Sequence, residues 1–175
     1  MVEAVLAVAG EPVTLEALQA VAGPDVERAR LEEAVELVRQ RHEQEGSGLH
    51  LERVAGGWRL VTRAQHEGAL REYLGYRAHS RLSQAALETL AIVAYRQPIT
   101  LPEINFLRGV NSAGVVRTLL ERKLVVVAGR KQVVGTPLLY RSSKEFLIHF
   151  GLSDLSALPT PEEVEQVVGE GTREP

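Results

Sequence analysis

Three short helical patterns, two strand patterns and a further helical pattern follow one another between Arg81 and Leu152. In the helical stretches apolar residues recur at a spacing of three or four, and the two strand patterns flank a loop containing glycine and proline. Three helices followed by a β-hairpin make up the winged-helix form of the helix-turn-helix module. This order constrains the chain most strongly. It predicts a mainly α fold with small β-hairpins (α+β).

Local start and stop signals place these elements. Ser83, Thr100, Ser112, and Ser142 or Ser143 are expected to act as helix N-caps, because their hydroxyls can accept from the first free amides of a helix. Gln97-Pro98-Ile99 and Gly151 are expected to end helices. The predicted elements are helices over 84–95, 101–107, 113–123 and 144–150, and wing strands over 124–128 and 138–141.

The first half of the chain repeats this plan. Pro12-Val13-Thr14-Leu15 matches Pro98-Ile99-Thr100-Leu101, and a second hairpin pattern surrounds Ala55-Gly56-Gly57. Thr14 and Thr62 are expected caps, and Pro24 suits the first turn of a long helix. The predicted elements are helices over 2–9, 15–21, 25–45 and 67–74, with strands over 49–54 and 58–62.

These matching orders predict tandem winged-helix domains. We expect an N-terminal winged-helix domain over 1–76, a linker over 77–81 and a C-terminal winged-helix domain over 82–158. Residues 159–175 are acidic and poor in aromatic side chains, so a flexible tail is expected there.

Charge is unevenly distributed along the chain. Residues 1–79 carry nine basic and 13 acidic side chains, residues 80–150 carry ten and four, and residues 151–175 carry one and six. A basic middle between acidic ends fits nucleic acid, an acidic protein partner or intramolecular pairing. There is no cysteine and no long apolar run. We therefore expect a cytoplasmic protein without a disulfide, a membrane span or a secretory signal.

The sequence shows no residue pattern typical of a catalytic or metal-binding site. The five histidines are scattered, and the serines stand at helix starts or turns, where capping explains them. The basic wing loop around Gly129-Arg130-Lys131 lacks the residue order of a phosphate-binding loop. We predict no enzyme activity, no metal site and no cofactor.

The helix that would read DNA is unsuited to base recognition. A helix-turn-helix protein presents the start of its third helix to base edges, and Arg, Lys, Asn or Gln make the specific contacts. Here the start is Ser112-Ala113-Gly114, and Glu121 lies in the middle of the exposed face. Weak, sequence-independent contact with phosphates stays open, through Arg108, Arg117, Arg130 and Lys131. A tandem winged-helix DNA-binding regulator is therefore the alternative, and a scaffold that docks through its acidic tail is a third possibility.

A series of short segments between Leu82 and Leu152 has a recognisable order and spacing: Leu82-Ser83, Ala86-Leu87-Glu88, Leu90-Ala91-Ile92, Gln97-Pro98-Ile99-Thr100, Arg108-Gly109-Val110-Asn111-Ser112, Leu119-Leu120-Glu121-Arg122 and Phe150-Gly151-Leu152. Through these segments the stretch resembles ScpB, the bacterial segregation and condensation protein B. The first half is similar more loosely, through its opening and the hairpin Gly56-Gly57-Trp58.

The resemblance implies a non-enzymatic subunit of the kite type. Such a subunit dimerises, here through the N-terminal domain, and binds the kleisin ScpA, which bridges the heads of an SMC ATPase. It implies a role in chromosome condensation and segregation during cell division, in the cytoplasm and associated with the nucleoid. The candidate partner-facing or DNA-facing residues are Arg108, Arg117, Glu121, Arg122, Arg130 and Lys131.

Overall fold

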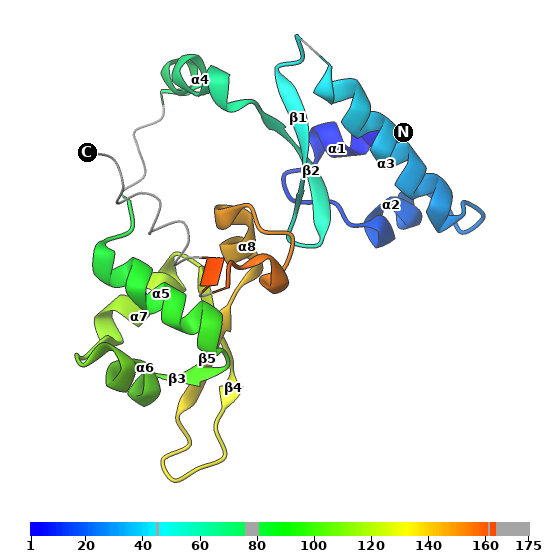
Figure 1. The fold of residues 1–175 in the computed structure, drawn as a ribbon. Coiled ribbons are helices and arrows are strands. Elements are labelled where there is room, and N and C mark those ends of the chain that lie inside the picture. The colour runs from blue at the N-terminus through cyan, green and yellow to red at the C-terminus, as the bar shows by residue number, and fades with distance from the viewer. Residues whose placement is uncertain (45, 76–80, 161, 164–175) are drawn as a thin grey trace.

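The computed structural model describes residues 1–44, 46–75, 81–160, 162 and 163. The N-terminal half contains α1 (Val2–Val8), α2 (Leu15–Ala22), α3 (Arg28–Glu43), β1 (Leu49–Val54), β2 (Gly57–Thr62), η1 (Ala64–His66) and α4 (Glu67–Leu74). The C-terminal half contains α5 (Gln84–Arg96), β3 (Ile99–Thr100), α6 (Leu101–Arg108), α7 (Ala113–Glu121), β4 (Val125–Arg130), β5 (Leu138–Ser142), α8 (Lys144–Phe150) and η2 (Leu155–Ala157). Figure 1 shows helices grouped beside a hairpin in each half. The predicted mainly α fold of tandem winged helices is confirmed.

The repeated motif has the same structural role in both halves. Val13 lies antiparallel to Trp58 in β2, and the two residues exchange backbone hydrogen bonds of 2.8 and 2.9 Å. Ile99, its counterpart, pairs with Tyr140 in β5, which gives the sheet order β3-β5-β4. In each half, the residue after the motif's proline therefore lies beside the second strand of the hairpin. The sequence did not predict β3, because two residues are too short to show a strand pattern.

Each half has its own hydrophobic core. Leu18, Leu31 and Val35 are buried in the first half. Leu90, Ile104 and Leu119 are buried in the second. Burying one such side chain contributes about 1.5–3 kcal/mol, so each cluster holds its own helices against its own hairpin.

The halves meet where the turn of the β1–β2 hairpin contacts the segment that follows α8 (Figure 1). The amides of Ala55 and Gly56 donate to the carbonyls of Leu152 and Ser153 at 2.9 and 2.8 Å. Lys144 Nζ also lies 3.1 Å from a carboxylate oxygen of Glu11. The N-terminal hairpin is thus part of an interface between the two halves.

Most predicted caps are confirmed. The side chains of Thr14, Ser83, Thr100 and Ser143 accept from backbone amides three residues ahead. Ser112 occupies the cap position of α7 without a capping bond, and Asn111 Oδ1 instead accepts from the Ala113 amide at 3.0 Å.

Two predicted helix starts and one helix end are wrong. The helix expected from residue 25 begins at Arg28, so Pro24 lies outside its first turn. Thr62 pairs with Leu49 in the hairpin and cannot cap α4, which begins after His66. The helix expected to reach residue 123 ends at Glu121, because Lys123 has a φ of 59°. Of the predicted linker 77–81 only residue 81 lies among the described residues, and most of the predicted tail lies outside them.

Candidate partner-binding surface

Helix α7 presents a small, nearly neutral outer face. Val116 and Leu119 are buried, as the helical pattern predicts, and Gly114, Thr118 and Glu121 are exposed. Arg117 Nε lies 3.0 Å from Glu121 Oε1, with both side chains mostly exposed. Because Glu121 offsets this guanidinium and would repel phosphate, the face is poorly suited to the major groove of DNA.

Two hydrogen bonds of Ser112 order the turn between α6 and α7. The Ser112 amide donates to Asn105 Oδ1 at 2.8 Å, and Ser112 Oγ donates to the Val110 carbonyl at 3.4 Å. Ser112 is 1% exposed, so its side chain serves the turn and does not reach a partner. The turn expected at Gly109-Val110-Asn111 is present, and Gly109 adopts the left-handed conformation with a φ of 69°.

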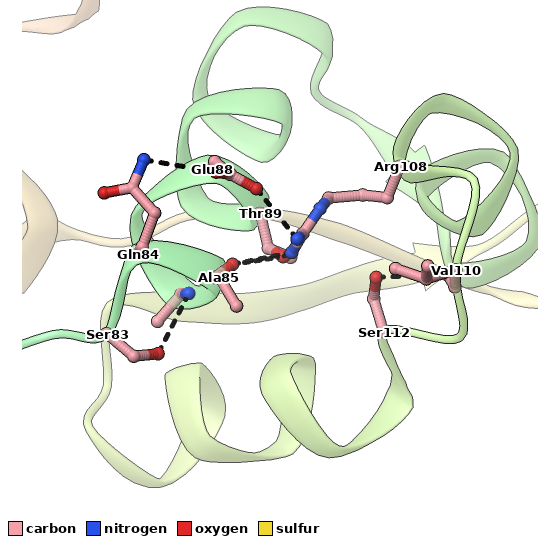
Figure 2. Close-up of polar contacts among 9 residues, drawn as sticks. Ser83, Gln84, Ala85, Glu88, Thr89, Arg108, Val110 and Ser112 are labelled. Atoms are coloured by element: carbon pink, nitrogen blue, oxygen red, sulfur yellow. Dashed lines mark hydrogen bonds and ion pairs between the residues drawn. The ribbon is translucent and has the colours of Figure 1, made fainter.

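Arg108 points into the domain. Its guanidinium donates to the Ala85 carbonyl at 2.7 Å and to Thr89 Oγ1, and it forms an ion pair with Glu88 at 2.8 Å. Figure 2 shows this side chain extending from the end of α6 to the first turns of α5. The Arg108 side chain is 12% exposed. The arginine therefore ties α6 to α5, and its geometry favours a structural role over a partner-facing one.

Lys131 and Glu103 join the wing to α6. Lys131 Nζ lies 2.5 Å from Glu103 Oε1, while Glu103 Oε2 accepts from the Thr100 amide at 2.9 Å. The hydrogen bonds from Lys131 and then from Thr100 lower the pKa of Glu103 to about 2. One carboxylate thus completes the capping box of α6 and fixes the base of the wing.

Arg130 and Arg122 are exposed at the surface. Arg130 Nη1 donates to the Thr136 carbonyl across the wing loop at 3.1 Å. The structure therefore separates the six candidate residues: Arg108 is internal, Lys131 is half-buried in an ion pair, and Arg117, Glu121, Arg122 and Arg130 face solvent.

An apolar patch on α6 was missed from the sequence. Phe106 is 87% exposed, and Leu107 and Val110 are about half exposed. We call these three residues the α6 ridge. Ile104, two positions before Phe106, is buried, so Phe106 lies on the opposite side of the helix, while Leu107 is at the edge of that side and Val110 is in the following turn. The helical spacing from Ile104 could have revealed it. Exposed apolar patches of this kind mark protein-interaction surfaces.

Two kinds of feature are absent from the part of the chain that the structure describes. No three His, Asp or Glu side chains in that part of the chain gather closely enough to bind a metal ion. Within the same ranges, no helix has the length and apolar character that crossing a bilayer requires.

Comparison with known proteins places the chain in a family. Residues 1–161 match the family model described as segregation and condensation complex subunit ScpB. Segregation and condensation protein B of Syntrophotalea carbinolica is 44% identical over 97% of this chain and 85% of its own length. The protein of that name from Myxococcus xanthus is 43% identical over 97% of this chain, which spans 51% of that relative's length.

Solved structures also match. The crystal structure of ScpB from Mycobacterium tuberculosis is 36% identical, covers 86% of this chain and 92% of its own, and aligns with a TM-score of 0.42. The family model covers most of the chain, and the curated relatives carry one shared name. The chain belongs to the ScpB family of segregation and condensation complex subunits.

Proposed function

We propose that this chain is a non-enzymatic subunit of an SMC complex that dimerises and binds the kleisin ScpA. Through ScpA it would act with the SMC ATPase in chromosome condensation and segregation, in the cytoplasm at the nucleoid. The observation that carries the proposal is the ScpB family match over residues 1–161. The surface of the C-terminal half supports a protein partner, because α7 carries an Arg117–Glu121 pair where a DNA-reading helix carries base-contacting side chains.

The α6 ridge and the basic charge fit that partner class. Phe106 is almost fully exposed beside the α6–α7 turn, and residues 80–150 carry a net positive charge. An apolar patch on a basic domain suits an acidic amphipathic segment of a partner protein. Purified ScpA from the same cells is the direct test. We expect the two proteins to co-purify and to bind at micromolar concentration; failure to associate would reject the proposal.

Dimerisation is proposed through the N-terminal half. A surface hollow of about 680 Å³ lies between α1, α2 and α3, and Met1, Val21 and Leu37 at its edge are each about 60% exposed. Apolar side chains exposed around a hollow are suited to burial against a second copy. We expect the full chain to be dimeric by light scattering and residues 80–175 alone to be monomeric. A stable dimer of the shorter fragment would contradict this arrangement.

DNA binding is the second candidate, and the exposed Arg130 of the wing is the observation that favours it. Titration of labelled duplex DNA at several salt concentrations separates the two functions. Weak binding that disappears as salt rises agrees with non-specific phosphate contact. Tight binding with preference for one sequence would favour a DNA-binding regulator.

Deleting residues 161–175 and repeating the ScpA measurement tests whether the acidic tail is a docking element.

A further inference from the structure

Strand β4 forms an open edge of the C-terminal sheet. The strand order is β3-β5-β4, so β5 has a neighbour on each side and β4 has one only. Within the described chain, no backbone hydrogen bond joins the outer side of β4 to another segment. Val127, Ala128 and Arg130 of this strand are exposed. An exposed edge strand offers unpaired amides and carbonyls to any extended segment that reaches it.

The register identifies which backbone groups point outward. The Ser143 amide donates to the Leu124 carbonyl at 3.2 Å, and the Lys131 amide donates to the Pro137 carbonyl at 2.9 Å. Antiparallel pairs alternate between hydrogen-bonded and non-hydrogen-bonded positions. Counting from these two bonds, and allowing for the bulge between Val127 and Gly129, the outward groups of the exposed part belong to Val127 and Arg130.

Charge selects what can lie against this edge. No acidic residue occurs between Leu124 and Ser143, whereas Lys123 and Arg130 stand at the two ends of β4 and Arg141 lies opposite Val126. A second copy paired antiparallel on the same edge would bring the Arg130 end of each strand to the Lys123 end of the other. Like charges placed opposite one another destabilise a strand pair. An acidic segment meets no such penalty.

We infer that the outer edge of β4, from Val127 to Arg130, receives an extended acidic segment of a partner protein as an added β-strand. Main-chain hydrogen bonds at Val127 and Arg130 would hold the segment, and the flanking cations would attract its acidic side chains. The inference rests on the proposed function, because the kleisin ScpA is the partner used to test it.

Hydrogen exchange of the full chain, free and with purified ScpA, tests the edge directly. We expect the amides of Val127 and Arg130 to exchange at least about tenfold more slowly in the complex. The amide of Val126, which faces β5, is the internal reference and should change much less. Binding of ScpA without protection at Val127 and Arg130 overturns the inference and leaves the proposed function standing. Absence of ScpA binding overturns both.

Substitutions at one position separate the backbone from the side chain. Val127→Pro removes an amide that the β4–β5 ladder does not use, and Val127→Ala keeps that amide while shortening the side chain. We expect Val127→Pro to weaken ScpA binding about tenfold or more, and Val127→Ala about twofold or less. Equal losses in the two variants would overturn the added strand.

A charge variant keeps the inference testable if Val127→Pro unfolds the domain. Arg130→Glu should weaken ScpA binding, and the difference from wild type should shrink as salt rises. Arg71→Glu, at an exposed arginine on α4, is the matched control and should leave binding unchanged. If raising the concentration of the chain alone protects Val127 and Arg130, the occupant is a second copy, and the inference is wrong.

Discussion

The amide of Ala55 donates to the carbonyl of Leu152 at 2.9 Å, and this bond joins the two halves of the chain. Ala55 and Gly56 have φ values of 49° and 75°, the pattern of a type I′ hairpin turn. Such a turn leaves the amides of its two central residues free of the hairpin ladder. Here both are used, because Gly56 donates to Ser153 at 2.8 Å. The type I′ turn therefore supplies the two amides through which the N-terminal half contacts the C-terminal half.

We expect the Ala55 and Gly56 amides to be protected from hydrogen exchange together. Their protection depends on contact between the halves, so they should open at a free energy below that of global unfolding and with matching rates. Exchange measured by NMR in the full chain checks this. Exchange of both amides at the rate of an unstructured turn would mean that the halves are undocked in solution.

Gly57→Ala should destabilise the N-terminal half. A Cβ at this position would lie 2.7 Å from the Val13 carbonyl oxygen and 2.8 Å from its carbon, so the backbone of the Val13 bridge would have to move. We expect a loss of about 1–3 kcal/mol in urea unfolding, typical of overpacking against a fixed neighbour.

Gly68→Ala is the control for Gly57→Ala. Gly68 lies in α4, and a Cβ there meets nothing within 4 Å. Alanine should leave stability unchanged or raise it by up to about 1 kcal/mol, because glycine is a poor helix former. Equal destabilisation by the two variants would contradict the role assigned to the Val13 bridge.

Most of the fold could be predicted from the capping residues and the helical periodicity of the sequence. Thr100 and Ser83 stand directly before apolar helical stretches, where a hydroxyl side chain is favoured as the N-cap. What the sequence could not show depends on contacts between distant segments. Arg108 looked like a surface cation because charge alone cannot show that Ala85 and Thr89 lie within its reach. The open edge of β4 likewise could not be predicted, because it depends on the pairing of β3 with the other side of β5.

Arg108→Ala should cost stability, although arginine substitutions at the surface rarely do. The side chain is 12% exposed, and its removal deletes the ion pair with Glu88 and the hydrogen bonds to the Ala85 carbonyl and to Thr89 Oγ1. We expect a loss of about 1–3 kcal/mol, measured by urea unfolding. Arg117→Ala is the control, because that side chain is 81% exposed in an i,i+4 pair and should cost less than about 0.5 kcal/mol. A similar cost for both would mean that Arg108 is not held as described.

Stability on the acid side should depend on Glu103. Its folded pKa is lowered from 4.5 to about 2 by Lys131 and then Thr100, so the ionised carboxylate favours the folded state. A depressed folded pKa contributes stability that is fully present above the unfolded value and is lost as pH falls through the folded value. Wild type should therefore lose its advantage over Glu103→Gln between pH 4.5 and about 2, as followed by urea unfolding at each pH. Glu145→Gln, an exposed carboxylate on α8, controls for loss of a surface charge. If the difference between wild type and Glu103→Gln stays constant across that range, Glu103 does not hold the wing to α6 through its ionised form.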